Sequence, residues 1–169
     1  MPAAHGRKSV KHQQVWIGLG IFALLAALGS ATLPHAQEPG DRLFCGGSYL
    51  TTIENSEGGF ASRSVITLHA DHTILAADSG EDGPTDYFGS QLGTWKPAGH
   101  HRIVARTINF RYLSGGGMAR SDYVINFAPD QGQVTGTITV TTFPLDADPF
   151  DGDGIVLGTF TFVGQLIQP

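Results

Sequence analysis

From Gly46 onward, apolar and polar residues alternate along short stretches, a pattern typical of antiparallel strands with one buried face. Glycine, threonine and serine are abundant, and no stretch shows the apolar spacing of a helix. Turn residues recur between the stretches. The pattern predicts strands at Ser48–Glu54, Phe60–Ala70, Thr73–Ser79, Ser90–Lys96, His101–Leu113, Ala119–Ala128, Gln133–Phe143 and Ile155–Ile167.

The short connections between these strands predict antiparallel neighbours in up-and-down order. Because no helix is available to cover a flat sheet, the strands are expected to close into an all-β antiparallel barrel of about eight strands. A two-layer sandwich of the same strands is the alternative. The two architectures differ in whether Tyr49–Ile53 pairs with Phe160–Leu166, as closure requires.

The alternation also predicts which side chains point into the barrel. Along 133–143, apolar residues and a glycine alternate with threonines, and along 119–128 one face gathers most of the apolar residues. The inward positions expected on 119–128 are Ala119, Ser121, Tyr123, Ile125 and Phe127. Those expected on 101–113 are Val104, Arg106, Ile108, Phe110 and Tyr112.

The N-terminal region reads as an export segment. A basic start without acidic residues precedes an apolar run at Val15–Leu28, and Gly29-Ser30-Ala31 supplies small residues for cleavage. This predicts a signal peptide at 1–31, a flexible lead-in at 32–46 and a barrel domain at 47–169, secreted or periplasmic. The alternative is an uncleaved membrane anchor, for which the run is short of the roughly 20 residues that a span needs.

Loss of the export segment would leave seven basic and fifteen acidic residues, a net charge of −8. A nucleic-acid partner is therefore not expected, since it would need a basic surface. Cys45 is the only cysteine, so an internal disulfide is impossible. No cofactor is expected.

Several short motifs carry a family resemblance. Gly93-Thr94-Trp95, Val104-Ala105-Arg106 and the closing run Gly158–Gly164 resemble a largely uncharacterised group of small exported bacterial β-barrels. That group is similar to lipocalin-like (calycin) barrels and to barrels of the allene-oxide-cyclase type. The resemblance covers most of residues 46–167 and implies a ligand-sized interior, but no reaction. In lipocalins the Gly-x-Trp lies on the first strand, whereas here it falls on the fourth, so no lipocalin binding residue is transferred.

Arg106 is the most informative candidate, because its expected place is inside the barrel. A buried charge requires a partner, for which Asp78 or the ring of Trp95 is available. Three interpretations follow: a buried pair that fixes strand register, an anion-binding or carbonyl-polarising group, or a bulge that turns the side chain outward.

Aromatic residues on the same face would form the wall of the interior. A tyrosine there can donate a proton to a bound oxygen or stand as an amphipathic wall residue. The expected ligand-binding set is Arg106, Tyr112, Tyr123, Trp95, Phe110 and Asp78. No nucleophile motif or phosphate loop is present, so no catalytic residue is assigned.

No metal site is expected from the sequence. His69, His72, His100 and His101 fall at or near turns, without ligand spacing. The acidic loop 146–153 has oxygen ligands but lacks the regular spacing and closing glutamate of an EF-hand.

These observations favour an exported barrel that binds a small apolar molecule in its interior. The alternatives are an isomerase or cyclase of the allene-oxide-cyclase type, with Arg106 or a tyrosine polarising an oxygen, and an interaction module. Ile155, Leu157 and Val163 are expected on the outer face of the last strand, which predicts a homodimer. The lead-in at 37–47 could cover the same strip instead. Contact with a membrane is expected only through an uncleaved N-terminal segment.

Overall fold

The computed structural model describes residues 46–81, 83, 87–112, 116–151 and 154–169. The predicted signal peptide, Cys45 and nearly all of the predicted lead-in lie outside these residues. The described chain forms eight strands: β1 (Gly47–Glu54), β2 (Phe60–Leu68), β3 (Thr73–Asp78), β4 (Gln91–Pro97), β5 (Arg102–Arg111), β6 (Gly117–Phe127), β7 (Gln133–Phe143) and β8 (Ile155–Leu166). It contains no helix of the length and apolar character needed to cross a membrane.

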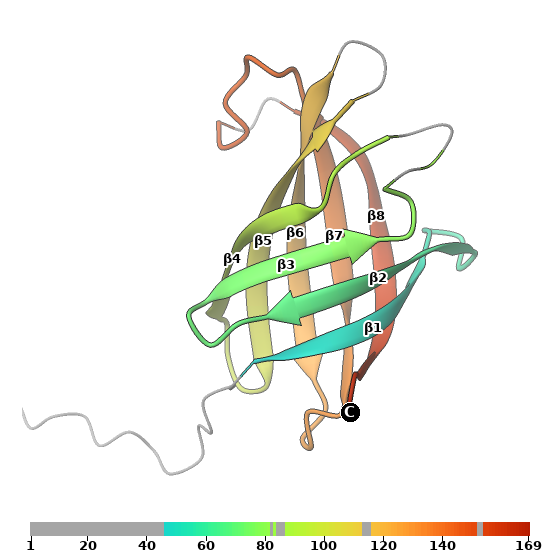
Figure 1. The fold of residues 1–169 in the computed structure, drawn as a ribbon, viewed down its shortest axis with the longest axis vertical. Coiled ribbons are helices and arrows are strands. Elements are labelled where there is room, and N and C mark those ends of the chain that lie inside the picture. The colour runs from blue at the N-terminus through green and yellow to red at the C-terminus, as the bar shows by residue number, and fades with distance from the viewer. Residues whose placement is uncertain (1–45, 82, 84–86, 113–115, 152–153) are drawn as a thin grey trace, which may run out of the picture. The chain divides into compact units, whose positions relative to one another are not determined.

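The strands pair antiparallel in chain order and close on themselves, which confirms the predicted barrel (Figure 1). Closure is made by β1 and β8, where Tyr49 lies opposite Leu166 and Ile53 opposite Phe162. In Figure 1, β1–β3 form the near wall and β5–β8 the far wall. The sandwich alternative is wrong because β1 and β8 are not free edges.

Up-and-down order gives the barrel two different ends. The odd-numbered strands end, and the even-numbered strands begin, at one end of the barrel, called here the cavity end. Turns 69–72, 98–101 and 128–132 meet at the opposite, packed end. Each packed-end turn has one non-glycine residue in the left-handed region, with φ of 71° at His72, 55° at His101 and 57° at Gln131. These turns therefore reverse the chain tightly.

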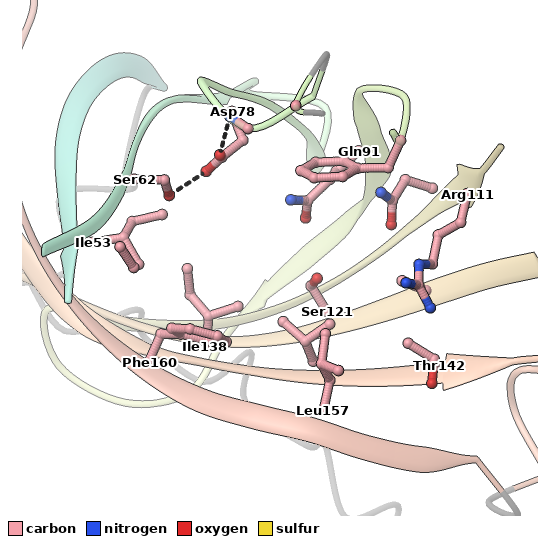
Figure 2. Close-up of a pocket in the computed structure, with 17 residues that line it drawn as sticks. Ile53, Ser62, Asp78, Gln91, Arg111, Ser121, Ile138, Thr142, Leu157 and Phe160 are labelled. Atoms are coloured by element: carbon pink, nitrogen blue, oxygen red, sulfur yellow. Dashed lines mark hydrogen bonds between the residues drawn. The ribbon is translucent and has the colours of Figure 1, made fainter. Parts of the chain in front are cut away.

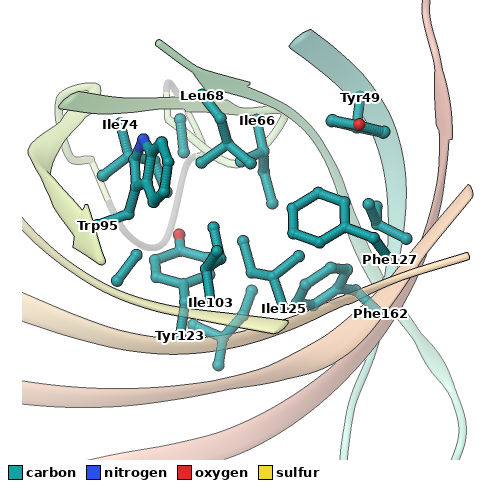
Figure 3. Packing of buried hydrophobic residues seen from close by; sticks show 14 of the residues in the cluster. Tyr49, Ile66, Leu68, Ile74, Trp95, Ile103, Tyr123, Ile125, Phe127 and Phe162 are labelled. Atoms are coloured by element: carbon teal, nitrogen blue, oxygen red, sulfur yellow. The ribbon is translucent and has the colours of Figure 1, made fainter. Parts of the chain in front are cut away.

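The hydrophobic core fills the interior toward the packed end (Figure 3). Trp95 is buried there, and its indole N–H donates to the carbonyl of His69 at 3.0 Å. The ring of Phe162 lies over Gly136, where a Cβ atom would come within 2.5 Å of it. The room left by this interior glycine is thus taken up by an aromatic ring.

The predicted facing is confirmed on β6, where all five expected inward residues are buried or line the interior. It is wrong on β5, where the inward residues are Ile103, Ala105, Thr107 and Asn109. The β5–β6 register runs without a bulge, so Arg106 points outward by plain alternation. The polar Thr107 and Asn109 suggested the solvent face, although they belong to the interior.

A register shift between Val140 and Thr141 interrupts the β7–β8 ladder near the cavity end. Such a bulge adds a residue to one strand and re-aims its side chains. As a result Leu157, predicted to point outward, lines the interior near the start of β8 while remaining largely exposed. Ile155 and Val163 are exposed as predicted.

Candidate functional site

A cavity of about 330 Å³ occupies the cavity end of the barrel, beyond the core (Figure 2). All eight strands contribute residues to its lining. The volume lies near the lower limit of ligand-binding cavities, which span roughly 300–1,000 Å³. The interior is therefore filled at the packed end and hollow at the cavity end.

The cavity has a polar side and an apolar side. The polar side runs from β2 to β5, and Figure 2 places Asp78 and Gln91 there, across the cavity from Phe160. The apolar side is formed mainly by β7, β8 and β1. Its residues are Ile138, Val140, Leu157, Phe160 and Ile53, with Thr142 as the polar exception.

Asp78 stands on the polar side at the end of β3. Its carboxylate accepts a hydrogen bond from the Ser62 hydroxyl at 2.9 Å and another from the Gly80 backbone N–H at 2.8 Å. Partial burial, and secondarily the charge of Glu81, raises the pKa of Asp78, although these two hydrogen bonds lower it. A desolvated acceptor thus faces the cavity.

Gln91, at the start of β4, is held in a defined orientation. Its Oε1 accepts from the Tyr123 hydroxyl at 2.6 Å and from the Thr107 hydroxyl at 2.9 Å. Burial raises the pKa of Tyr123, so its hydroxyl keeps its proton at neutral pH. With its oxygen engaged by two donors, the carboxamide of Gln91 has its NH₂ group left for another acceptor.

Asn109 is a buried polar residue of the lining, with 6 % of its surface exposed. Leu92 pairs with Ile108, so one step further along the same register Gln91 faces Asn109. Among the described residues, no hydrogen bond to the Asn109 carboxamide is found, and none of its atoms is both unpartnered and fully buried. Its polar atoms are therefore open to the cavity.

The predicted site residues are distributed over three regions. Asp78 lines the cavity, whereas Tyr123 supports it through Gln91 and Trp95 belongs to the core. Phe110 and Tyr112 are 51 % and 57 % exposed. The prediction that both line the interior is therefore wrong.

Arg106 lies on the outer face, where it pairs with Asp122 directly across β5 and β6. Arg120 binds the same carboxylate at 2.9 Å and also donates to the carbonyl of Pro149. The proposed pairing of Arg106 with Asp78 is therefore wrong. The three residues form an ion network on the outer face, and Arg120 joins it to Pro149 in the connection after β7.

Three polar residues of the cavity lining were not predicted from the sequence: Gln91, Asn109 and Arg111. Asn109 and Arg111 share one face of β5 with Thr107, and the alternation assigned this face to the solvent. Gln91 begins its strand and has no neighbouring pattern that distinguishes it.

The turn histidines lie at the packed end, away from the cavity. The His72 ring lies 4.4 Å from that of Trp95, and the rings of His100 and His101 are 4.1 Å apart. Within the described ranges, no three His, Cys, Asp or Glu side chains gather as a metal site would require.

Comparison of the chain with family models, curated proteins and solved structures gives no match. The barrel and its cavity are therefore interpreted from their own residues.

Proposed function

We propose that this chain is an exported binding protein that holds a small, mostly apolar molecule in the cavity of its barrel. The observation that supports the proposal is that the interior is packed at one end of the barrel and hollow at the other. The packed end is filled by aromatic and aliphatic side chains, but the cavity end keeps about 330 Å³ free. A barrel that needed its interior only for stability would gain by filling that space as well.

The lining fits this role better than it fits a catalytic centre. Small-molecule sites combine apolar walls with a few well-placed polar groups. Here the apolar wall of β7, β8 and β1 supplies contact area, and three polar residues supply orientation: Asp78, Gln91 and Asn109.

Native mass spectrometry of the protein purified from its own host tests the proposal. We expect a fraction of the protein to carry a small molecule that is released by denaturation. The control is Ala119→Leu, because buried Ala119 lines the cavity opposite Asn109 and a larger side chain would fill the space. Equal mass spectra of wild type and variant, both free of any added mass, would overturn the proposal.

An isomerase or cyclase is the second candidate, and the observation that favours it is the Asp78 carboxyl. A carboxyl inside a cavity, with a pKa raised by burial, can exchange a proton with a bound substrate. Arg106 has no place in this scheme, since it lies outside the barrel. Recovery of a bound molecule in two isomeric forms, one of which is lost in Asp78→Asn, would support catalysis.

Export is proposed from the N-terminal sequence alone: a basic start, an apolar run and a small-residue exit. N-terminal sequencing of the envelope or medium fraction should find a chain that begins near Thr32 or Gln37. A chain found only in the cytosol would contradict export.

A further inference from the structure

The polar side of the cavity carries hydrogen-bonding groups whose donor and acceptor roles are already set by their neighbours. The Asp78 carboxylate can only accept, and the Gln91 carboxamide has its oxygen engaged by Tyr123 and Thr107. A bound molecule therefore meets an acceptor on β3 next to a donor on β4.

Strand pairing brings these groups into one row. Ala76 pairs with Gln91 across β3 and β4, and Asp78 lies two residues further along the same face. Asn109 faces Gln91 from β5 and offers both an acceptor and a donor. The row thus reads acceptor, donor, and then a group of either kind.

Charge gives a second constraint on the molecule. Asp78 and Arg111 both line the cavity and carry opposite charges. A charged ligand would be attracted by one of these charges and repelled by the other, and it would lose part of its own hydration, which costs free energy. A neutral molecule avoids that cost.

We propose that the cavity selects a neutral, compact molecule with an N–H donor and a carbonyl acceptor side by side on one edge, as in a lactam or a cyclic amide, and an apolar opposite edge. The donor faces Asp78, the carbonyl faces the Gln91 amide, and Asn109 completes the edge. The apolar edge packs on β7 and β8. This inference rests on the proposed binding function and defines its ligand class.

Asn109 supplies the independent support for this inference. Asn109 is more than nine-tenths buried and lines the cavity, and its carboxamide has no hydrogen-bond partner among the residues described. Buried polar groups are normally satisfied, so an open one in a ligand-sized cavity marks a place where a ligand or water completes the bonding.

The test uses four bicyclic probes of similar size, titrated calorimetrically into the purified protein. 2-Quinolone carries the adjacent N–H and carbonyl, N-methyl-2-quinolone lacks the donor, naphthalene lacks both, and 2-naphthoate is an anion. We expect 2-quinolone to bind about tenfold or more tightly than each of the others, as the loss of one hydrogen bond to a charged group implies. Equal or tighter binding of naphthalene or 2-naphthoate would overturn the inferred ligand class.

Variants separate the roles of the polar residues. Asn109→Leu should weaken 2-quinolone binding about tenfold and leave naphthalene binding unchanged. Tyr123→Phe should weaken 2-quinolone alone, because Tyr123 is a positioning residue that fixes the Gln91 amide. The matched control is Asn126→Leu, the same replacement at an exposed position of β6, which should bind like the wild type.

Probe binding and retention of a host molecule together show whether the ligand class alone is wrong or the binding function as well. If no probe binds but the host-purified protein retains a molecule, the ligand class is wrong and the binding function stands. If no probe binds and nothing is retained, both are wrong.

Discussion

Replacing Asn109 by leucine should make the protein more stable while impairing its site. Asn109 is 6 % exposed, and its carboxamide has no protein partner among the described residues. A fully desolvated polar group without a partner costs about 1–3 kcal/mol, and for the Asn109 carboxamide, which opens to the cavity, water recovers part of that cost. Leucine would remove the penalty and add apolar contact on the polar side of the cavity.

From these terms we expect a gain of about 1–2 kcal/mol in the free energy of unfolding. For a domain of this size, that corresponds to a rise in Tm of about 3–10 °C. Thermal unfolding followed by circular dichroism measures it, with Asn126→Leu as the control for an exposed asparagine. A Tm that falls by several degrees in Asn109→Leu would refute the reasoning, because it would mean that the carboxamide is bonded within the fold.

Three further predictions concern charge and surface. Asp78 has a raised pKa in the folded protein, so its contribution to stability is complete below the unfolded value of 3.8 and is lost as pH rises through the raised pKa. Asp78→Asn should therefore be more stable than the wild type by a margin that widens as the pH rises above 3.8. A constant margin in Tm would contradict the burial argument. Arg106→Ala should change the free energy of unfolding by less than about 1 kcal/mol in urea titrations, since the Arg106 side chain is 47 % exposed in its pair with Asp122. A loss of several kcal/mol would contradict its place on the outer face. If the exposed apolar residues of β8 form a homodimer interface, Val163→Glu should give a monomer in light scattering. Thr94→Glu, at an exposed position of β4, should leave the dimer intact. A wild type that is already monomeric at tens of micromolar would contradict the dimer prediction.

The fold was predictable because its signals are local. Turn residues mark the strand ends, and short connections leave up-and-down order as the simplest topology. Closure was predicted because the sequence offers no helix to cover a flat sheet, and the pairing of β1 with β8 confirms it.

The site was less predictable because polar side chains can point into a cavity, whereas beside a packed interior they normally point to solvent. On β5, Thr107 and Asn109 face inward toward the cavity, whereas Ile108 and Phe110 face outward. Hydrophobic alternation assumes a dry interior, so it assigned this strand to the wrong side and placed Arg106 inside. On β6 the inward face is mostly apolar, and there the same rule gave the correct side.

The bulge on β7 and β8 is a second feature that alternation could not supply. It adds one residue near Leu157 and carries that side chain to the cavity. Nothing in the sequence of β8 marks the extra residue, since Ile155, Val156 and Leu157 are all apolar. The position of the bulge depends on pairing with β7.

The central claim is that a small molecule binds at the cavity end. A titration of the ¹⁵N-labelled protein with the small-molecule fraction extracted from host-purified protein tests it most directly. We expect amide shifts at Ser121 and at the side-chain amides of Gln91 and Asn109, with little change at Ile66 and Ile125 in the core. Shifts confined to the outer face, or no shift at any residue that lines the cavity, would contradict it.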